Sequence, residues 1–184
     1  QKQAARSCAF SPDGALLALG RIDGFVDLLD VAAGYKTVCS LECHSMTMSS
    51  TAFRYSVALT VTPSGKLMLG VGSRSHHFGV LCNVSGWRTF TEATLISAPE
   101  INMIKLHGHT DDIEQVRFSP DGAVPITASD DRTLIVWDAE TGARLHLLGP
   151  SHSQFVRTVC FHPTDGNVIA TASDDESVLL WRTP

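Results

Sequence analysis

The stretch VRFSPDGAVPITASDDRTLIVWDA occupies residues 116–139, and VCFHPTDGNVIATASDDESVLLWRT occupies residues 159–183. Each contains a short apolar run, a turn rich in Pro, Asp and Gly, a second apolar run, a polar turn and a third apolar run. Pro presets φ at the start of a turn, Asp and Ser bond nearby backbone amides, and Gly accepts positive φ. Short apolar runs joined by such turns predict an antiparallel meander of buried strands.

The same pattern occurs twice more, in residues 8–31 and 59–84. The last residues of the four first runs are 51, 57 and 43 residues apart, at Phe10, Val61, Phe118 and Phe161. Four-stranded propeller blades repeat every 40–45 residues or so, so the third interval is regular and the first two contain insertions. We place the insertions at 42–53 and 87–101, which are rich in Ser, Thr and Met and lack regular alternation.

Composition narrows the class of protein. The chain has 184 residues, 43% of them hydrophobic, and a formal net charge of -5, which gives no general attraction to nucleic acid or acidic membranes. No apolar run reaches the length of about 18 residues that a membrane-spanning helix needs. The cysteines are odd in number, which argues against a disulfide framework and for a reducing compartment, cytoplasmic or nuclear: Cys8, Cys39, Cys43, Cys82 and Cys160. The chain begins with Gln1 and no signal peptide follows, so we expect a segment of a longer protein.

Residues 105–183 resemble the WD-repeat β-propeller family. Gly108-His109 precedes the first run of the third repeat and Trp137-Asp138 closes its third run, while the fourth repeat has Ser151-His152 and Trp181-Arg182 at these places. Residues 5–84 are similar to the family to a lesser degree, and no residue selects a subfamily.

The resemblance implies an all-β propeller with blades of four antiparallel strands. About four blades are expected in this chain, the last without its outer strand, at 5–42, 54–106, 109–149 and 152–184. The outer strand of the second blade is expected either at 101–106 or at 87–91. Four blades are the lower limit for a closed propeller. We therefore expect part of a seven- or eight-bladed disc, whose remaining blades or a second copy of the chain cover the open edge.

The resemblance also implies a hydrogen-bonded tetrad in each complete blade, which stabilises the fold by satisfying buried polar atoms. The tetrads are expected at His109, Ser129, Asp131 and Trp137, and at His152, Ser173, Asp175 and Trp181. In the first repeat only Asp23 keeps the pattern, since Gln1, Arg21 and Leu29 hold the other positions, and in the second repeat Arg74 replaces the Asp. We expect the first two blades to depend on apolar packing and strand pairing alone.

Ser, His and Asp together could also suggest an acyl-transfer triad. The set occurs twice in register, its hydroxyl lies in a strand expected to be buried, and no nucleophile elbow is present, so we reject a catalytic role. No phosphate loop or dinucleotide fingerprint occurs either. The sequence predicts a protein that is not an enzyme and needs no cofactor.

Metal-ligating residue types cluster in three places without a recognised spacing. Cys39, Cys43 and His44 lack a fourth ligand and a second Cys-x2-Cys unit, so we interpret them as a strand followed by a loop. The acidic groups Asp111-Asp112 and Asp174-Asp175-Glu176 lack the spacing of a calcium loop. We predict no metal site.

The remaining candidate is a surface. The loop before the first strand of a blade and the turn between its second and third strands lie on one rim of the disc. The third and fourth repeats place acidic residues and one arginine there, namely Asp111, Asp112, Asp130, Asp174, Glu176 and Arg132. The first two repeats place Arg21, Arg74, His76 and His77 there. We expect a rim divided by charge, whose acidic half either binds a basic or polar peptide or only keeps the protein soluble.

The sequence thus favours a non-catalytic scaffold that binds other proteins or peptides. Two alternatives stay open: a propeller domain of a larger assembly, such as a ubiquitin-ligase substrate receptor or a signalling ATPase sensor, and a cytoskeleton- or chromatin-binding propeller. Nucleic acid and membranes are not favoured as partners.

Overall fold

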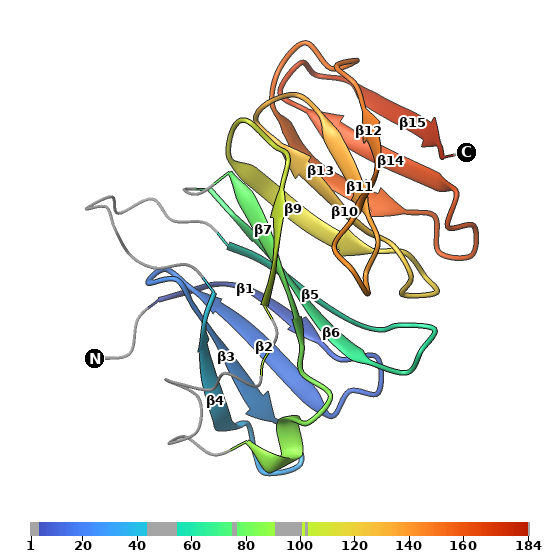
Figure 1. The fold of residues 1–184 in the computed structure, drawn as a ribbon. Helices are drawn as coiled ribbons and strands as arrows, with labels where there is room; N and C mark the ends of the chain where they lie inside the picture. The colour runs from blue at the N-terminus through green and yellow to red at the C-terminus, as the bar shows by residue number, and fades with distance from the viewer. Residues whose placement is uncertain (1–3, 44–54, 75–76, 91–100, 102, 184) are drawn as a thin grey trace.

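The computed structural model describes residues 4–43, 55–74, 77–90, 101 and 103–183, and these form fifteen strands and one short 3-10 helix (Figure 1). The strands make four separate antiparallel sheets. The first sheet is β1 (Ala5–Phe10), β2 (Leu16–Arg21), β3 (Phe25–Asp30) and β4 (Lys36–Glu42). The second is β5 (Tyr55–Val61), β6 (Leu67–Ser73), β7 (Phe78–Asn83) and β8 (Met103–His107). The third is β9 (Ile113–Phe118), β10 (Pro125–Ser129), β11 (Leu134–Trp137) and β12 (Arg144–Leu148), and the fourth is β13 (Val156–Phe161), β14 (Val168–Ser173) and β15 (Val178–Arg182).

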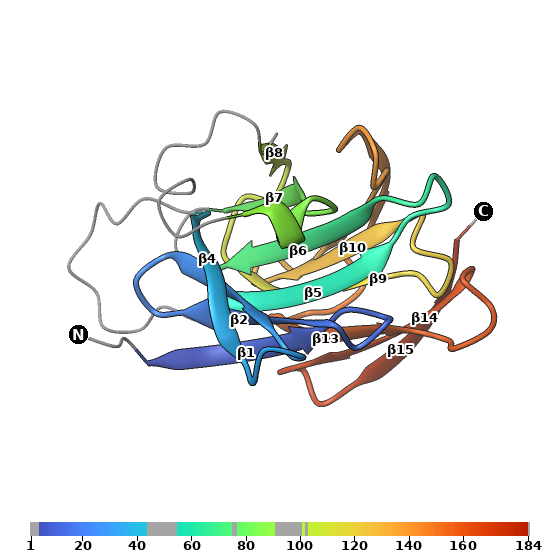
Figure 2. The ribbon, with the colours of Figure 1, turned by 90° about the horizontal axis from the view of Figure 1, so that it is seen from below.

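Each sheet is a meander in which strands pair in chain order. The first strands of the sheets, β1, β5, β9 and β13, follow one another side by side (Figures 1 and 2). Residues from all four strands line a common cavity of about 490 Å³. This is the arrangement of propeller blades around an axis, as the resemblance implied, and the sheets form an arc that is not closed.

Apolar side chains between neighbouring sheets form the core. One cluster, which includes Leu28 and Val71, joins the first sheet to the second. Another, with Leu81 and Trp137, joins the second to the third, and a third cluster, with Ile126 and Ile169, joins the third to the fourth. Each sheet thus stabilises its neighbour by burying apolar area.

The turn between β9 and β10 shows how the SPDG sequence folds. Ser119 Oγ donates to Asp121 Oδ1 at 2.6 Å and accepts the Val124 N–H at 3.0 Å. Short side chains thus supply hydrogen-bond partners within the turn. Gly122 has φ of 74°, and a Cβ there would lie 2.1 Å from the Val61 carbonyl oxygen. The turn needs glycine both for its conformation and for its approach to the second sheet.

Two insertions were expected from the repeat spacing. The first, 42–53, lies mostly outside the described residues. In the second, the alternative outer strand over 87–91 is wrong: Trp87–Thr89 is a 3-10 helix whose Trp87 packs into the core, and β8 begins at Met103. No helix in the described segments is long and apolar enough to cross a membrane.

Candidate functional site

A buried hydrogen-bond network connects the rim of the third sheet to its interior. His109 Nδ1 lies 2.8 Å from Asp131 Oδ2, and His109 Nε2 lies 2.7 Å from Thr127 Oγ1. The Trp137 indole N–H donates to Thr127 Oγ1 at 2.9 Å. If Nδ1 carries the imidazole proton toward Asp131, the Thr127 hydroxyl donates to Nε2 and accepts from the indole, and every polar atom is satisfied. Gly108 leaves room for this packing, because a Cβ there would lie 3.2 Å from the indole ring of Trp137.

The fourth sheet repeats the network. His152 Nδ1 lies 3.0 Å from Asp175 Oδ2, and His152 Nε2 lies 2.8 Å from Thr171 Oγ1. The Trp181 indole donates to Thr171 Oγ1 at 2.9 Å. Both histidine side chains are fully buried. A buried polar group without a partner costs free energy, so these contacts act on stability.

The expected serines are not the hydroxyl members of these networks. Ser129 and Ser173 lie two residues further along the strand, at the turn, where Ser129 Oγ donates to the Asp111 carbonyl and accepts the Asp131 N–H. Successive residues of a strand face opposite sides, so a residue two positions away shares the face of Thr127 but lies one step further from the indole. The signal for Thr127 and Thr171 was present, since each is four residues before the Asp and diagonal to the Trp in the strand register.

The two aspartates of the networks are held as carboxylates. Burial alone would raise the pKa of Asp131, but hydrogen bonds from His109, Thr133 and the Thr110 N–H outweigh it and hold the pKa well below its usual value. A hydrogen bond from Ser177 is the main cause that lowers the pKa of Asp175. Both aspartates therefore carry a negative charge near neutral pH.

The first sheet contains a polar network of its own, which corrects the expectation that apolar packing alone holds it. Arg21 donates from Nε to Asp23 Oδ1 at 3.1 Å and from Nη1 to Asp27 Oδ1 at 3.0 Å. Ser40 Oγ donates to the same Asp27 oxygen at 2.5 Å. Arg21 thus connects the turn after β2 with β3, and Asp27 connects β3 with β4 through Ser40. Motif-based assignment missed this network because Asp27 and Ser40 lie outside the tetrad positions.

Two arginines form ion pairs between neighbouring sheets at the rim. Arg74 Nε lies 2.9 Å from Glu114 Oε1, as an ion pair without hydrogen-bond alignment, and Arg74 Nη2 lies 3.5 Å from Asp130. Arg157 donates to Asp130 at 3.0 Å and to Asp174 at 2.8 Å, and it also contacts Glu114. We call these five residues the inter-sheet ion cluster. It runs across the second, third and fourth sheets.

Glu114 and Arg157 were missed, although their sequence positions correspond. Each is five residues after the histidine of its repeat, so equivalent strands place them at the same height in adjacent sheets. Burial, followed by the contact with Asp130, raises the pKa of Glu114 to about 7, and the two arginines oppose this shift. The cluster therefore contains a carboxyl group that titrates near neutral pH.

The ion cluster changes the expected charge of the rim. Arg74 from the second repeat pairs with Asp130 from the third, Asp130 is only 7% exposed, and Arg21 is paired within its own sheet. Arg157, which was not expected at the rim, also neutralises part of the acidic half by pairing with Asp174. Residues that still face solvent include Asp111, Arg132, Glu176 and His77, while His76 lies outside the described residues. The rim therefore carries ion pairs between sheets instead of the expected division by charge into two halves.

A groove opens on this rim between the third and fourth sheets. Its volume is about 480 Å³, and its lining includes Asp111, Arg132, Gln154 and Phe155. Phe155 is 41% exposed, with the Arg157 guanidinium 4.8 Å from its ring centre. The groove combines an apolar ring with a half-exposed carboxylate, as sites for basic side chains do.

Two members of the group formed by Cys39, Cys43 and His44 lie among the described residues. His44 lies outside the described residues, and Cys39 and Cys43 are buried. Burial raises the pKa of Cys39 to about 12, and a hydrogen bond with Cys82 raises that of Cys43. Both groups are therefore thiols rather than thiolates near neutral pH in the metal-free protein.

Comparison with known proteins identifies the repeats. The family described as "WD domain, G-beta repeat" matches residues 101–138 and 143–182. Protein HIR1 of Coccidioides immitis (strain RS) is 26% identical over 179 residues, covering 86% of this chain and 16% of that protein. LEC14B homolog of Prunus armeniaca is 28% identical over 167 residues, covering 86% of this chain and 32% of that protein. WD-40 repeat-containing protein MSI4 of Arabidopsis thaliana is 39% identical over 64 residues, covering 34% of this chain and 13% of that protein.

The chain thus spans less than a third of the length of each of these relatives. The two matched repeats together cover less than half of the chain. The longer alignments, which cover 86% of it, also include residues of the first and second sheets. The two matched repeats contain the two histidine networks.

Proposed function

We propose that the chain, which contains two WD40 repeats and has propeller-type sheets, is a non-catalytic scaffold that binds partner proteins or peptides on its rim. The groove between the third and fourth sheets is the observation that supports this proposal most. It lies where the third and fourth sheets meet, it is large enough for one or two side chains, and its walls are the loops and turns next to their strands.

The chemistry of the groove favours a basic segment of the partner. The Asp111 side chain is 51% exposed and offers a carboxylate, and the exposed ring of Phe155 offers an apolar and cation-binding face. Arg132 at the margin favours a partner with an acidic or polar residue beside the basic one. Complementary charges of this kind set partner choice and encounter rate more than affinity.

Binding by selected peptides tests the proposal. A phage-displayed random peptide library selected against the chain is expected to yield sequences with Lys or Arg beside an apolar residue. We expect at least tenfold weaker binding of these peptides to F155A, because the ring supplies the apolar contact, and unchanged binding to T164A, an exposed position in the β13–β14 turn. Peptides that bind F155A as well as the unmodified chain would refute the groove as the site.

Asp130 and Asp174 are unsuitable for such a test. Both belong to the inter-sheet ion cluster, so a charge reversal there breaks contacts with Arg157 as well as altering the surface. Loss of partner binding in those variants would report damage to the blades. F155A removes the ring beside Arg157 but leaves the carboxylates of the cluster and their ion pairs in place.

The relatives are several times longer than this chain, which supports a second proposal: the sheets are a propeller segment of a larger assembly.

The cytoplasm or nucleus is the proposed location, because all five cysteines are free and reducing compartments keep thiols in that form. Fractionation of cells that express the protein tests the location.

A further inference from the structure

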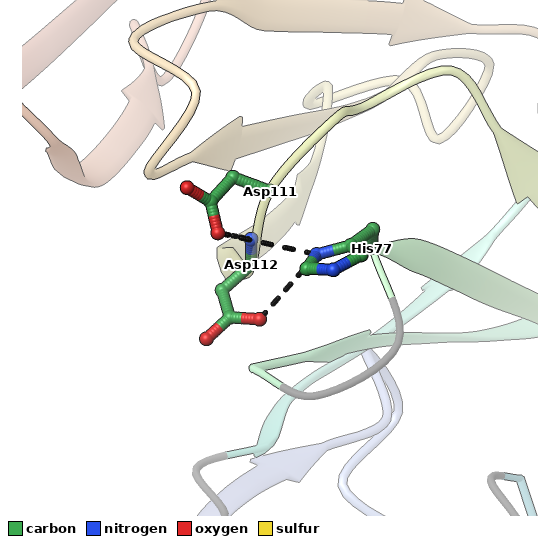
Figure 3. A group of neighbouring side chains, drawn as sticks. All are labelled: His77, Asp111 and Asp112. Atoms are coloured by element: carbon green, nitrogen blue, oxygen red, sulfur yellow. Dashed lines mark hydrogen bonds and ion pairs between the residues drawn. The ribbon is translucent and has the colours of Figure 1, made fainter.

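Three metal-ligating side chains from two different sheets converge at the rim, beside the proposed groove, with which they share Asp111. His77 lies in the turn between β6 and β7, and Asp111 and Asp112 lie between β8 and β9 (Figure 3). His77 Nδ1 is 3.5 Å from Asp112 Oδ1 and 4.0 Å from Asp111 Oδ1. The three ligand atoms all lie within 4.8 Å of one another.

The loop that carries the two aspartates is held by hydrogen bonds. The Asp130 N–H donates to the Asp112 carbonyl at 2.9 Å, and the Ser129 hydroxyl donates to the Asp111 carbonyl at 3.3 Å. The Asp112 N–H donates to Asp111 Oδ1 at 2.8 Å, which orients that carboxylate beside its neighbour. The turn of the third sheet thus fixes two carboxylates in position opposite a histidine of the second sheet.

The spacing suits one small divalent ion. Zinc binds imidazole nitrogen and carboxylate oxygen at about 2.0–2.2 Å, so two atoms bound to one tetrahedral ion are roughly 3.3–3.6 Å apart. The His77 and Asp112 atoms already have this separation, and the half-exposed Asp111 side chain needs only a small rotation to reach it. Two carboxylates and a neutral imidazole also balance the charge of a divalent ion.

The mixed ligand set narrows the choice of ion. Imidazole favours zinc and the neighbouring transition metals, whereas calcium and magnesium prefer sites made of oxygen alone. Three protein ligands leave at least one position for water, as in open zinc sites. We propose that His77, Asp111 and Asp112 bind one divalent ion of the zinc type and thereby connect the β6–β7 turn to the loop before β9.

Calorimetry and cobalt spectroscopy test the proposal on the chain without a histidine tag, after treatment with a chelator. Zn²⁺ titration is expected to show one ion bound per chain. Binding should be at least tenfold weaker in H77G and in D112N. Glycine suits the φ of 52° at His77, and asparagine keeps the shape of Asp112 while it removes the charge. The controls H146A and E176Q remove an exposed histidine and an exposed rim carboxylate elsewhere, and both should bind as the unmodified chain does.

Cobalt identifies the ligands. Co²⁺ in the site should give visible absorption without the near-ultraviolet band of a cobalt–thiolate bond. The proposal is overturned if Zn²⁺ shows no saturable binding, if H77G and D112N bind it unchanged, or if the thiolate band appears and C160S abolishes it. Circular dichroism shows whether the variants fold, and D111N gives a further variant should H77G fail to do so.

Discussion

Thr127 and Thr171 are the residues on which the two histidine networks depend most. Each hydroxyl contacts both an imidazole and an indole, so its removal leaves two buried groups without partners. For T127V, which keeps the side-chain shape, we expect a loss of about 2–4 kcal/mol in the free energy of unfolding. S129A should cost about 1 kcal/mol or less, because Ser129 has weaker contacts at the turn. Urea unfolding measures both, and a larger effect of S129A would contradict the assignment of the hydroxyl member.

Glu114 makes stability depend on pH. Its pKa in the folded protein is about 7, against a usual value of 4.5, so the folded state holds an extra proton between these values. The stabilisation from that proton is present below pH 4.5 and is lost as the pH rises through 7. The free energy of unfolding of the unmodified chain should therefore fall by about 1–2 kcal/mol relative to E114Q between pH 5 and 8. Parallel curves for the two proteins in urea unfolding across this range would refute the raised pKa.

At the scale of strands and sheets, Arg157 connects the third sheet to the fourth through Glu114, Asp130 and Asp174. In R157M, the nearly buried carboxylates of Asp130 and Glu114 lose a cation, and we expect a loss of about 1–3 kcal/mol, limited by the partial exposure of the guanidinium. The matched control R144M removes an exposed arginine on β12 and should change stability by no more than about 0.5 kcal/mol. Equal unfolding midpoints for R157M and R144M in urea would show that the cluster does not hold the two sheets together.

The sequence predicted the strands and turns well because their signals are local. The SPDG turns, the apolar runs and the Gly-His and Trp-Asp pairs each act within a few residues, so the positions of β9 to β15 followed from them. The sequence left two positions open for the outer strand of the second sheet. One of them contains a 3-10 helix whose Trp87 packs into the core. No local pattern distinguishes such a helix from a short strand.

The contacts between sheets could not be predicted from motifs. The cluster of Arg74, Glu114 and Arg157 depends on how far each sheet rotates about the axis, and so does the convergence of His77 with Asp112. Corresponding positions in successive repeats were the available signal, since Glu114 and Arg157 have the same place in their repeats. The expected division of charge was overestimated because it counted side chains without pairing them.

At the scale of the whole molecule, the outer face of the fourth sheet leaves large apolar side chains in solvent. Val178 and Leu180 on β15 are 68% and 77% exposed, and within the described chain no strand pairs with the outer edge of β15. Phe10, on the first strand of the arc, is 53% exposed. Faces of this kind associate, and in a longer propeller they pack against further blades.

We therefore expect the isolated chain to self-associate, with a sedimentation coefficient that rises with protein concentration. V178K/L180K should reduce this rise, because two charges oppose the burial of that face. L145K/L147K, which changes two exposed leucines on β12, should not reduce it. A chain that sediments as a monomer at all concentrations would contradict the expectation that another sheet covers these faces.

Hydrogen–deuterium exchange of the chain with a selected basic peptide tests the central claim, binding on the rim of a WD40-repeat scaffold, most directly. The account predicts slower exchange on peptide addition in residues 110–112, 130–132 and 153–155, which surround the groove, and unchanged exchange in the turns at the opposite ends of the sheets. Slower exchange confined to β15 or β1, with none in the three groove segments, would contradict it.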